Sequence, residues 1–190
     1  MTALGPEPHG ATPLDDEDLD GLIPDHVTNR GELNQAEFEN LLAALPWAER
    51  QADRTDPVGL LTYSFLFKLH QQMFRDVWRW AGHQRKSETN IGVDPAQIAE
   101  RVKVVLDDAA YWHAHGTYPA AETAVRLHHR LVAIHPFPNG NGRCTRLIAD
   151  LYLRSAGADR LGWGGSDLAT EGDLRSDYLE SLRTADAGHY

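Results

Sequence analysis

The stretch that decides the fold spans residues 120–155 and reads AAETAVRLHHRLVAIHPFPNGNGRCTRLIADLYLRS. In its first part, Ala124, Leu127, Leu131 and Ile134 recur at the three- and four-residue intervals of a helix face. Pro136 then interrupts the pattern, and a turn rich in Asn and Gly follows. A second apolar pattern runs to residue 155. The stretch therefore predicts two helices, over 120–134 and 141–155, joined by a short turn.

The same periodicity predicts further helices on both sides of this pair. We expect them over residues 34–45, 60–80, 95–113 and 173–185. In the first of these, Asn34 and Glu37 form a capping-box pattern, Phe38 begins the apolar face, and Pro46 is expected to end the helix. Residues 81–94 lack helical period and contain Gly and Asn, which indicates a loop or short hairpin. The predicted fold is all-α, with a small β-hairpin.

Length and composition limit the class of protein. The 190 residues suit one domain, which we divide into an acidic N-terminal arm (1–30) and a helical domain (31–190). No apolar run is long enough to cross a membrane, and the N-terminus lacks a signal-peptide pattern. A single cysteine excludes a disulfide framework and favours a reducing, cytoplasmic location. The net charge of −10 argues against nucleic-acid binding.

The turn between the two central helices carries the chemistry. Gly140 and Gly142 allow backbone N–H groups to converge at a helix N-terminus, where an anion binds well. Arg143 and Arg146 share a face of that helix, and their guanidinium groups can grip phosphate oxygens. His135, just before the turn, is placed to accept a proton from an attacking hydroxyl. These residues predict phosphate-ligand binding with a general base, which fits phosphoryl or nucleotidyl transfer.

The pattern His135-x-Phe-x-x-Gly-Asn-Gly-Arg-x-x-Arg146 resembles the signature of the Fic family, whose fifth position is an acid. Residues 76–85, the Asn-Ile-Gly-Val of 90–93 and the helix before the motif also resemble Fic domains. Within the family, Gly-Leu-Ile-Pro-Asp-His at 21–26 and the segment from Arg175 resemble the group called mobile mystery protein B. The resemblance implies a Fic-type helical bundle in which residues 85–93 are a flap that pairs with a target strand.

The resemblance also implies a reaction, the transfer of AMP from ATP to a Ser, Thr or Tyr hydroxyl of a target protein. His135 would be the general base of this transfer. Asn141, with the backbone of Gly140 and Gly142, would hold the α-phosphate. Arg143 and Arg146 would bind the β- and γ-phosphates.

Two positions bear on metal binding and regulation. Asn139 stands where the family has an acid that holds Mg²⁺, so we expect Mg²⁺ to bind weakly, because an amide oxygen carries no charge. Thr28-Asn-Arg-Gly-Glu32 resembles the start of the inhibitory Fic motif, which would make Glu32 a regulatory residue that pairs with Arg146.

Two alternatives stay open beside AMP transfer. One is transfer of another group, such as phosphate, UMP or phosphocholine. The other is a non-catalytic module that binds a nucleotide or a companion protein, as in a toxin–antitoxin-like pair, because Asn139 replaces the metal-binding acid.

Overall fold

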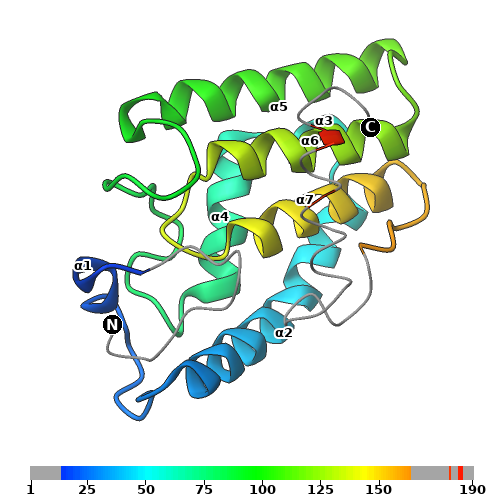
Figure 1. Ribbon diagram of the computed structural model, residues 1–190. Helices are drawn as coiled ribbons and strands as arrows, with labels where there is room; N and C mark the ends of the chain where they lie inside the picture. The colour runs from blue at the N-terminus through cyan, green and yellow to red at the C-terminus, as the bar shows by residue number, and fades with distance from the viewer. Residues whose placement is uncertain (1–13, 164–179, 181–183, 186–190) are drawn as a thin grey trace.

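A computed structural model describes residues 14–163, 180, 184 and 185 of the chain (Figure 1). The helices of residues 14–163 are α1 (Asp16–Leu19), α2 (Arg30–Arg54), α3 (Pro57–Leu60), α4 (Tyr63–Phe74), the 3₁₀ turn η1 (Pro95–Gln97), α5 (Ile98–His115), α6 (Ala120–Ile134) and α7 (Asn141–Ser155). The boundaries of α6 and α7 are those that the apolar periodicity predicts, and α5 ends two residues later than predicted.

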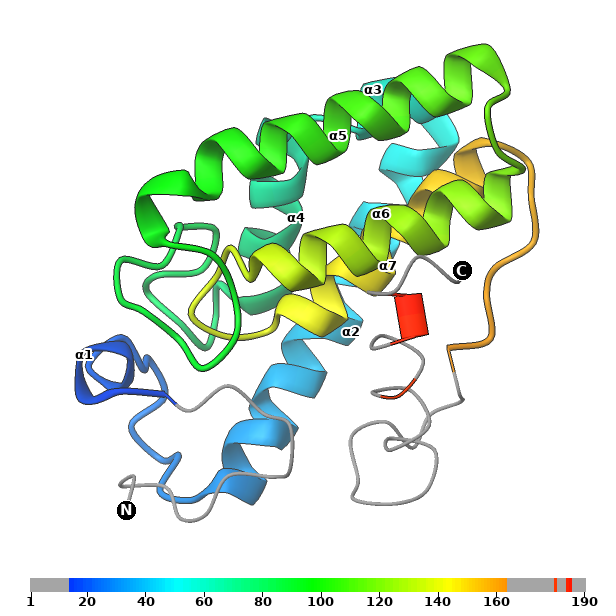
Figure 2. The ribbon, with the colours of Figure 1, turned by 45° about the horizontal axis from the view of Figure 1, so that its top comes forward.

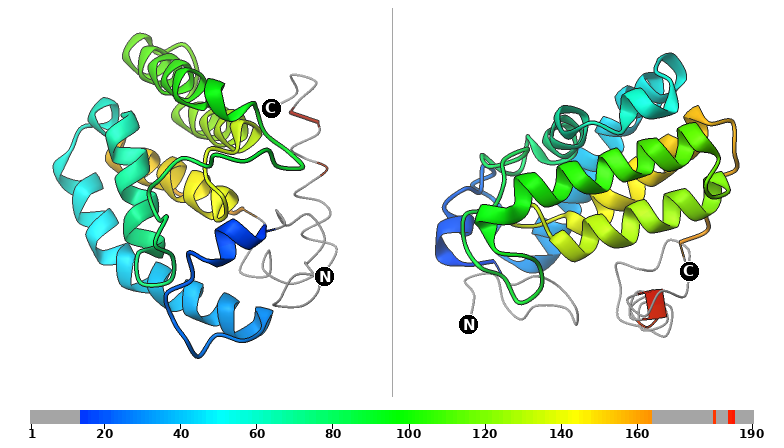
Figure 3. Two further views of the ribbon diagram at one scale, coloured as in Figure 1. Left: turned by 90° about the vertical axis from the view of Figure 1, so that its left-hand side faces the viewer. Right: turned by 90° about the horizontal axis from the view of Figure 1, so that it is seen from above.

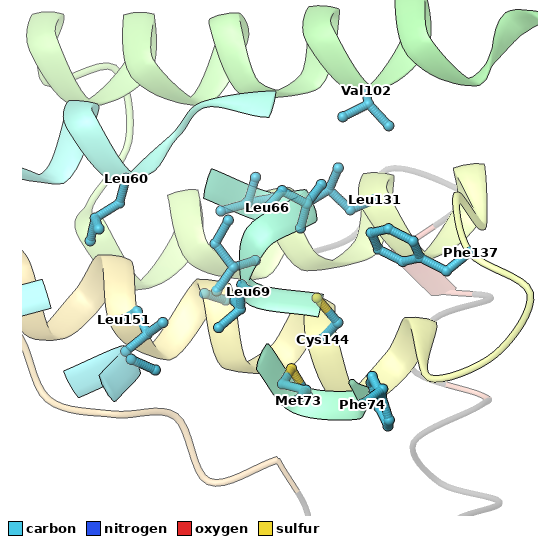
Figure 4. Packing of buried hydrophobic residues seen from close by; sticks show 14 of the residues in the cluster. Leu60, Leu66, Leu69, Met73, Phe74, Val102, Leu131, Phe137, Cys144 and Leu151 are labelled. Carbon is cyan, nitrogen blue, oxygen red and sulfur yellow. The ribbon is translucent and has the colours of Figure 1, made fainter. Parts of the chain in front are cut away.

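Helix α7 lies at the centre of the bundle. It packs against α6 on one side and against α2, α3 and α4 on the other, while α5 covers α6 (Figures 1 and 3). Side chains from α4, α6 and α7 meet in one continuous core, in which Leu69, Met73, Leu131, Cys144 and Leu151 are buried (Figure 4). The core therefore fixes the helices on both sides of the α6–α7 turn.

Helix α2 differs from the prediction at both ends. Its N-cap is Asn29, whose side chain accepts a hydrogen bond from the Glu32 N–H, so the helix begins before Asn34. Pro46 lies inside the helix, which continues to residue 54 because Ala48 and Ala52 are buried against the bundle. Packing of this later part outweighs the backbone hydrogen bond that proline removes.

The predicted apolar face of α2 is also wrong. Phe38 is 53% exposed, whereas Leu33, Glu37, Asn40 and Ala44 face the core. The polar members of this buried face have partners: the Asn40 side chain bonds to the backbone N–H and the carboxylate of Asp76. Hydrophobicity alone selects the wrong side of a helix when buried positions are polar but hydrogen-bonded.

The helix predicted over residues 60–80 is shorter in the structure. Its predicted first residue, Leu60, is the last residue of α3, and α4 runs only from Tyr63 to Phe74. After it, the chain turns so that Trp78 forms an isolated antiparallel bridge with Leu22. The Val77 carbonyl accepts from the Ile23 N–H at 2.9 Å, and the Arg79 N–H donates to the Gly21 carbonyl at 2.8 Å. These contacts replace the helical hydrogen bonds that would extend α4.

The all-α class is confirmed, but the predicted hairpin is not present. Residues 81–94 form no strand in the described chain. Their backbone bonds instead to the α6–α7 connection: the Arg85 N–H donates to Pro136 and the Val93 N–H to Ile134. The helix predicted over 173–185 lies largely outside the described residues. Of the described helices, none combines the length and the apolar character that crossing a bilayer requires.

Candidate active site

The connection between α6 and α7 is built around a strained histidine. His135 follows the last residue of α6 with φ 56° and ψ 63°, and it is the one non-glycine residue at positive φ in the described chain. Such a conformation costs free energy and is found most often at functional sites. The His135 side chain is largely buried, so its position is set by the fold.

The hydrogen bonds of His135 define its tautomer. Its Nδ1 lies 2.9 Å from the Val132 carbonyl, which can only accept, so Nδ1 carries the proton. In the neutral ring the lone pair is then on Nε2, the atom with which a general base takes up a proton. Burial lowers the pKa of His135, the Val132 carbonyl opposes this shift, and the charge of Arg85 lowers the pKa further. His135 therefore favours the neutral form that a base needs.

Arg85 ties residues 81–93 to His135. Its guanidinium donates to the His135 carbonyl at 2.6 Å, to the Ser87 carbonyl at 2.8 Å and to the Val93 carbonyl. Gly92 lies so close that a Cβ added there would come within 2.9 Å of the His135 Cβ. The segment therefore runs beside the α6–α7 connection (Figure 2). The residues predicted to form a flap lie next to the predicted base.

A buried histidine on α4, His70, contacts the turn between α6 and α7. His70 on α4 accepts from the Gly82 N–H on Nδ1 at 2.9 Å, so Nε2 carries the proton and donates to the Asn139 carbonyl at 3.0 Å. Its ring stacks on Phe137 with centroids 3.8 Å apart. Burial lowers the pKa of His70 to about 3. Through its hydrogen bond to Asn139, this neutral side chain links the backbone of the turn to α4.

The glycines of the predicted phosphate cradle, Gly140 and Gly142, lie at the start of α7. Gly140 is the N-cap with φ 76°, and a Cβ there would meet the Phe74 ring at 2.5 Å. Within the described chain, no side chain caps this helix, and its first turn contains no acid. The backbone N–H groups and the positive end of the helix dipole therefore suit an anion.

Asn141 has a different position from the one expected of a phosphate ligand. Its side chain is buried, and its amide closes the turn on one residue: Oδ1 accepts from the Phe137 N–H at 2.9 Å, and Nδ2 donates to the Phe137 carbonyl at 2.8 Å. In this conformation Asn141 shapes the loop in which Gly140 and Gly142 lie.

A carboxylate from α2 joins the cradle. The Glu37 Oε2 accepts from the Arg143 Nη2 at 2.7 Å, and Oε1 accepts from the Asn139 Nδ2 at 3.0 Å. The Arg143 guanidinium also lies over the Phe74 ring, 4.9 Å from its centroid. Around the α6–α7 connection the structure thus places His135, Asn139, Gly140, Asn141, Gly142 and Arg143, with Glu37 from α2 beside them.

The two remaining predicted residues are Arg146 on α7 and Glu32 on α2. Arg146 follows Arg143 by one turn of α7, and an added Gly142 Cβ would be 3.5 Å from its Nη1. Glu32 lies in the first turn of α2, where its Oε2 accepts from the N–H and the hydroxyl of Thr28 at 2.7 and 3.0 Å. These bonds lower the pKa of the exposed Glu32 carboxyl.

The residues present do not fit a divalent cation well. Asn139 uses its Oδ1 to accept from the Gly140 N–H at 2.7 Å and its Nδ2 to donate to Glu37. The Glu37 carboxylate is itself 2% exposed and accepts hydrogen bonds from three donors. Mg²⁺ is usually held by accessible carboxylates together with substrate phosphates. The residues 14–163 contain no cluster of three or more His, Cys, Asp or Glu suited to a metal.

Sequence reasoning missed three residues of this site. From the sequence, Glu37 is expected to cap a helix, His70 lies within a predicted helix, and Arg85 lies in the predicted flap. None of the three is predicted to contact the motif. A charged residue at a core position of the α2 periodicity is the signal that could have found Glu37. His70 and Arg85 reach the motif through the backbone carbonyls of Asn139 and His135, which lie 69 and 50 residues away, and no local pattern shows such contacts.

The chain is similar to known proteins in sequence. The sequence model of the Fic/DOC family matches residues 60–153. The probable protein adenylyltransferase y4lH of Sinorhizobium fredii is 30% identical over 140 residues, which cover 70% of this chain and 69% of that protein. The protein adenylyltransferase fic-1 of Caenorhabditis elegans is 31% identical over 115 residues, 57% of this chain, and the match spans only 20% of that protein.

Solved structures share the fold. A Fic-domain-containing signaling protein from Bacteroides thetaiotaomicron superposes with a TM-score of 0.66 at 22% identity, covering 84% of this chain and 60% of that one. BepC of Bartonella tribocorum, solved with bound AMPPNP, gives 0.62 at 16% identity, covering 88% of this chain and 90% of that one. With the motif, the fold and these relatives in agreement, the chain belongs to the Fic/DOC family and is distantly related to protein adenylyltransferases.

Proposed function

We propose that this protein transfers AMP from ATP to a Ser, Thr or Tyr hydroxyl of a target protein. The observation that carries the proposal is the position of His135 beside the uncapped N-terminus of α7. His135 can accept the hydroxyl proton, and the N-terminus of α7 can bind the phosphates. The family relationship to protein adenylyltransferases supports the same reaction.

Each residue has a defined role in this reaction. His135 accepts the proton of the target hydroxyl on Nε2, and the hydroxyl oxygen attacks the α-phosphorus. The bond from that phosphorus to the β-phosphate bridging oxygen breaks, and pyrophosphate leaves. The backbone at Gly140 and Gly142 stabilises charge on the α-phosphate, as an oxyanion site does. Arg143 and Arg146 bind the β- and γ-phosphates.

The segment 85–93 is assigned to the target protein. It runs beside His135 and forms no strand of its own in the described chain. Backbone groups that have no sheet partner can pair with an extended segment of another protein, the mode called β-augmentation. We assign the chain to the mobile mystery protein B group on the sequence pattern, with a companion protein as a further partner.

A labelling experiment tests the proposed transfer. Purified protein is incubated with Mg²⁺ and with ATP labelled on either the α- or the γ-phosphate, and label on protein is measured in a cell extract that supplies targets. Only label that depends on the added protein is counted, because kinases of the extract transfer γ-phosphate themselves. On that count, AMP transfer predicts label from the α-phosphate alone and its loss, by a factor of about 100 or more, in His135→Ala. Label from the γ-phosphate alone would instead assign phosphate transfer.

The neutral residue at position 139 favours a second candidate function, a module that binds nucleotide without turnover. The observation that favours this candidate is that the Asn139 amide is hydrogen-bonded to Glu37 and Gly140 and is therefore poorly suited to bind a metal. Absence of label from both donors, together with measurable ADP binding, would support this candidate and reject transfer.

A further inference from the structure

The buried carboxylate of Glu37, which is not part of the motif, accepts hydrogen bonds from two motif residues, Asn139 and Arg143. Glu37 is a residue of α2, and only 2% of it is exposed. Its Oε1 accepts from the Trp78 Nε1 at 2.7 Å and from the Asn139 Nδ2 at 3.0 Å, while Oε2 accepts from the Arg143 Nη2 at 2.7 Å. A carboxylate is taken out of water only where such donors compensate for lost hydration. The three donors at this site therefore favour a carboxylate at position 37.

We propose that Glu37 is a positioning residue of the phosphate cradle, which orients the Arg143 guanidinium and requires a neutral amide at position 139. This inference rests on the proposed function, since the cradle is the site that would bind the nucleotide phosphates. It makes Glu37 and Asn139 a matched pair, in which the negative charge that the Fic signature places in the loop lies instead on α2.

The hydrogen bonds of Asn139 explain why an amide is needed. Nδ2 faces Glu37 and Oδ1 faces the Gly140 N–H at 2.7 Å. A rotated amide would set an acceptor against the carboxylate and a donor against the N–H, so one orientation is fixed. An aspartate would put two carboxylate oxygens about 3.0 Å apart. Like charges at this distance repel strongly where water is excluded.

Arg143 gains a defined direction from the same carboxylate. Glu37 holds one guanidinium nitrogen, and the Phe74 ring lies against its face. The Arg143 side chain nevertheless keeps 31% of its area exposed. An arginine that is already oriented loses less side-chain entropy when it binds phosphate. Glu37 thus acts on the ligand through Arg143 and needs no contact with it.

A double-mutant cycle tests this pairing. The variants are Glu37→Gln, Asn139→Asp and the two combined, and the readouts are the midpoint of thermal unfolding and the Kd for ADP in EDTA. Asn139→Asp sets a second carboxylate against Glu37, and Glu37→Gln sets an amide N–H against a donor in either orientation, at Arg143 or at Asn139. We expect each change to weaken ADP binding about tenfold. Combined, the glutamine amide donates to the new carboxylate but also faces the Trp78 Nε1, so the Kd should recover in part, to within about tenfold of wild type rather than the roughly hundredfold loss that simple addition gives.

Glu39→Gln is the matched control. Glu39 is an exposed carboxylate two residues along α2 that accepts a hydrogen bond from Gln35 at 2.7 Å. Its removal changes the net charge by the same amount but leaves the cradle intact. We expect its Kd for ADP and its unfolding midpoint to match those of the wild type.

The inference fails if the losses in the two single variants simply add in the double variant. It also fails if the unfolding midpoints fall but the ADP affinity does not change, since Glu37 would then be only structural. If the wild type binds no ADP, the proposed function fails and the cradle role with it. The recovery of the unfolding midpoint in the double variant then still decides whether residues 37 and 139 form a matched pair.

Discussion

At the scale of single residues, the site depends on polar side chains that the fold removes from water. His70, Arg85 and Glu37 are all buried, and each bonds to the motif or its flanks. Buried polar groups are tolerated when their hydrogen bonds are made, and they then fix one arrangement of the surrounding backbone. The geometry of the motif is therefore determined by residues outside it.

His70 predicts a pH dependence of stability. Its pKa is about 3 in the fold against 6.5 for a free histidine, so below pH 6.5 the unfolded chain binds a proton that the folded chain does not. Stability is complete above pH 6.5 and is lost as the pH falls, by up to about 1.4 kcal/mol per pH unit. His128, with a pKa of about 3, adds to this loss.

His70→Gln tests this assignment by urea unfolding at pH 7.5 and pH 5. The variant should be less stable at pH 7.5 by about 1–3 kcal/mol, because it loses the paired hydrogen bonds. Its stability should fall less on acidification, because glutamine does not titrate. His26→Gln, at an exposed histidine, is the control and should follow the wild type. Equal pH slopes for wild type and His70→Gln would contradict the account.

The sequence located the residues of the motif but not their supports. His135, Gly140 and Arg143 follow one another in a short pattern, so their proximity is local information. Glu37 lies 106 residues before Arg143, and its contact depends on how α2 packs on α7. Asn141 was found by the motif, but its bonds to Phe137 became visible only in three dimensions.

At the scale of elements, predictions succeeded where hydrophobic period and turn chemistry agreed. Helices α6 and α7 have strong apolar faces and are bounded by Pro and Gly. Helix α2 is capped by Asn29 and not by the predicted Asn34, and the earlier start includes the buried Leu33 in the helix. The segment 81–94 lacks a hairpin because its backbone bonds to the α6–α7 connection.

The start of α7 gives a prediction at this scale. Gly140→Ala introduces a Cβ at positive φ and 2.5 Å from the Phe74 ring. Gly116 at the end of α5 has φ 60° with no atom within 4 Å of an added Cβ. Gly116→Ala should therefore cost only the backbone strain, about 1–2 kcal/mol of unfolding free energy.

Gly140→Ala should cost about 1–3 kcal/mol more than this control, because the overlap adds to the strain. Urea unfolding at pH 7.5 measures both variants. If the two variants lose equal stability, Gly140 is not held against Phe74 as the structure places it.

At the scale of the whole molecule, charge is unevenly distributed. The chain carries a net charge of −10, yet residues 121–154 hold five arginines and two acids. Four of those arginines pair with carboxylates: Arg126 with Glu122, Arg130 with Asp108, Arg143 with Glu37, and Arg154 with Asp53. An acidic surface disfavours polyanions such as nucleic acids. A local phosphate site can still bind a small nucleotide, because short-range hydrogen bonds outweigh a screened field.

The measurement that tests the central claim most directly is a calorimetric titration of the protein with ADP and, separately, with adenosine. Binding through the phosphates, at the start of α7 and at Arg143, predicts that ADP binds and that adenosine binds at least about tenfold more weakly. Arg143→Ala should reduce this difference. Equal affinity for the two ligands, or ADP binding that is unchanged in Arg143→Ala, would contradict a phosphate cradle at the α6–α7 turn.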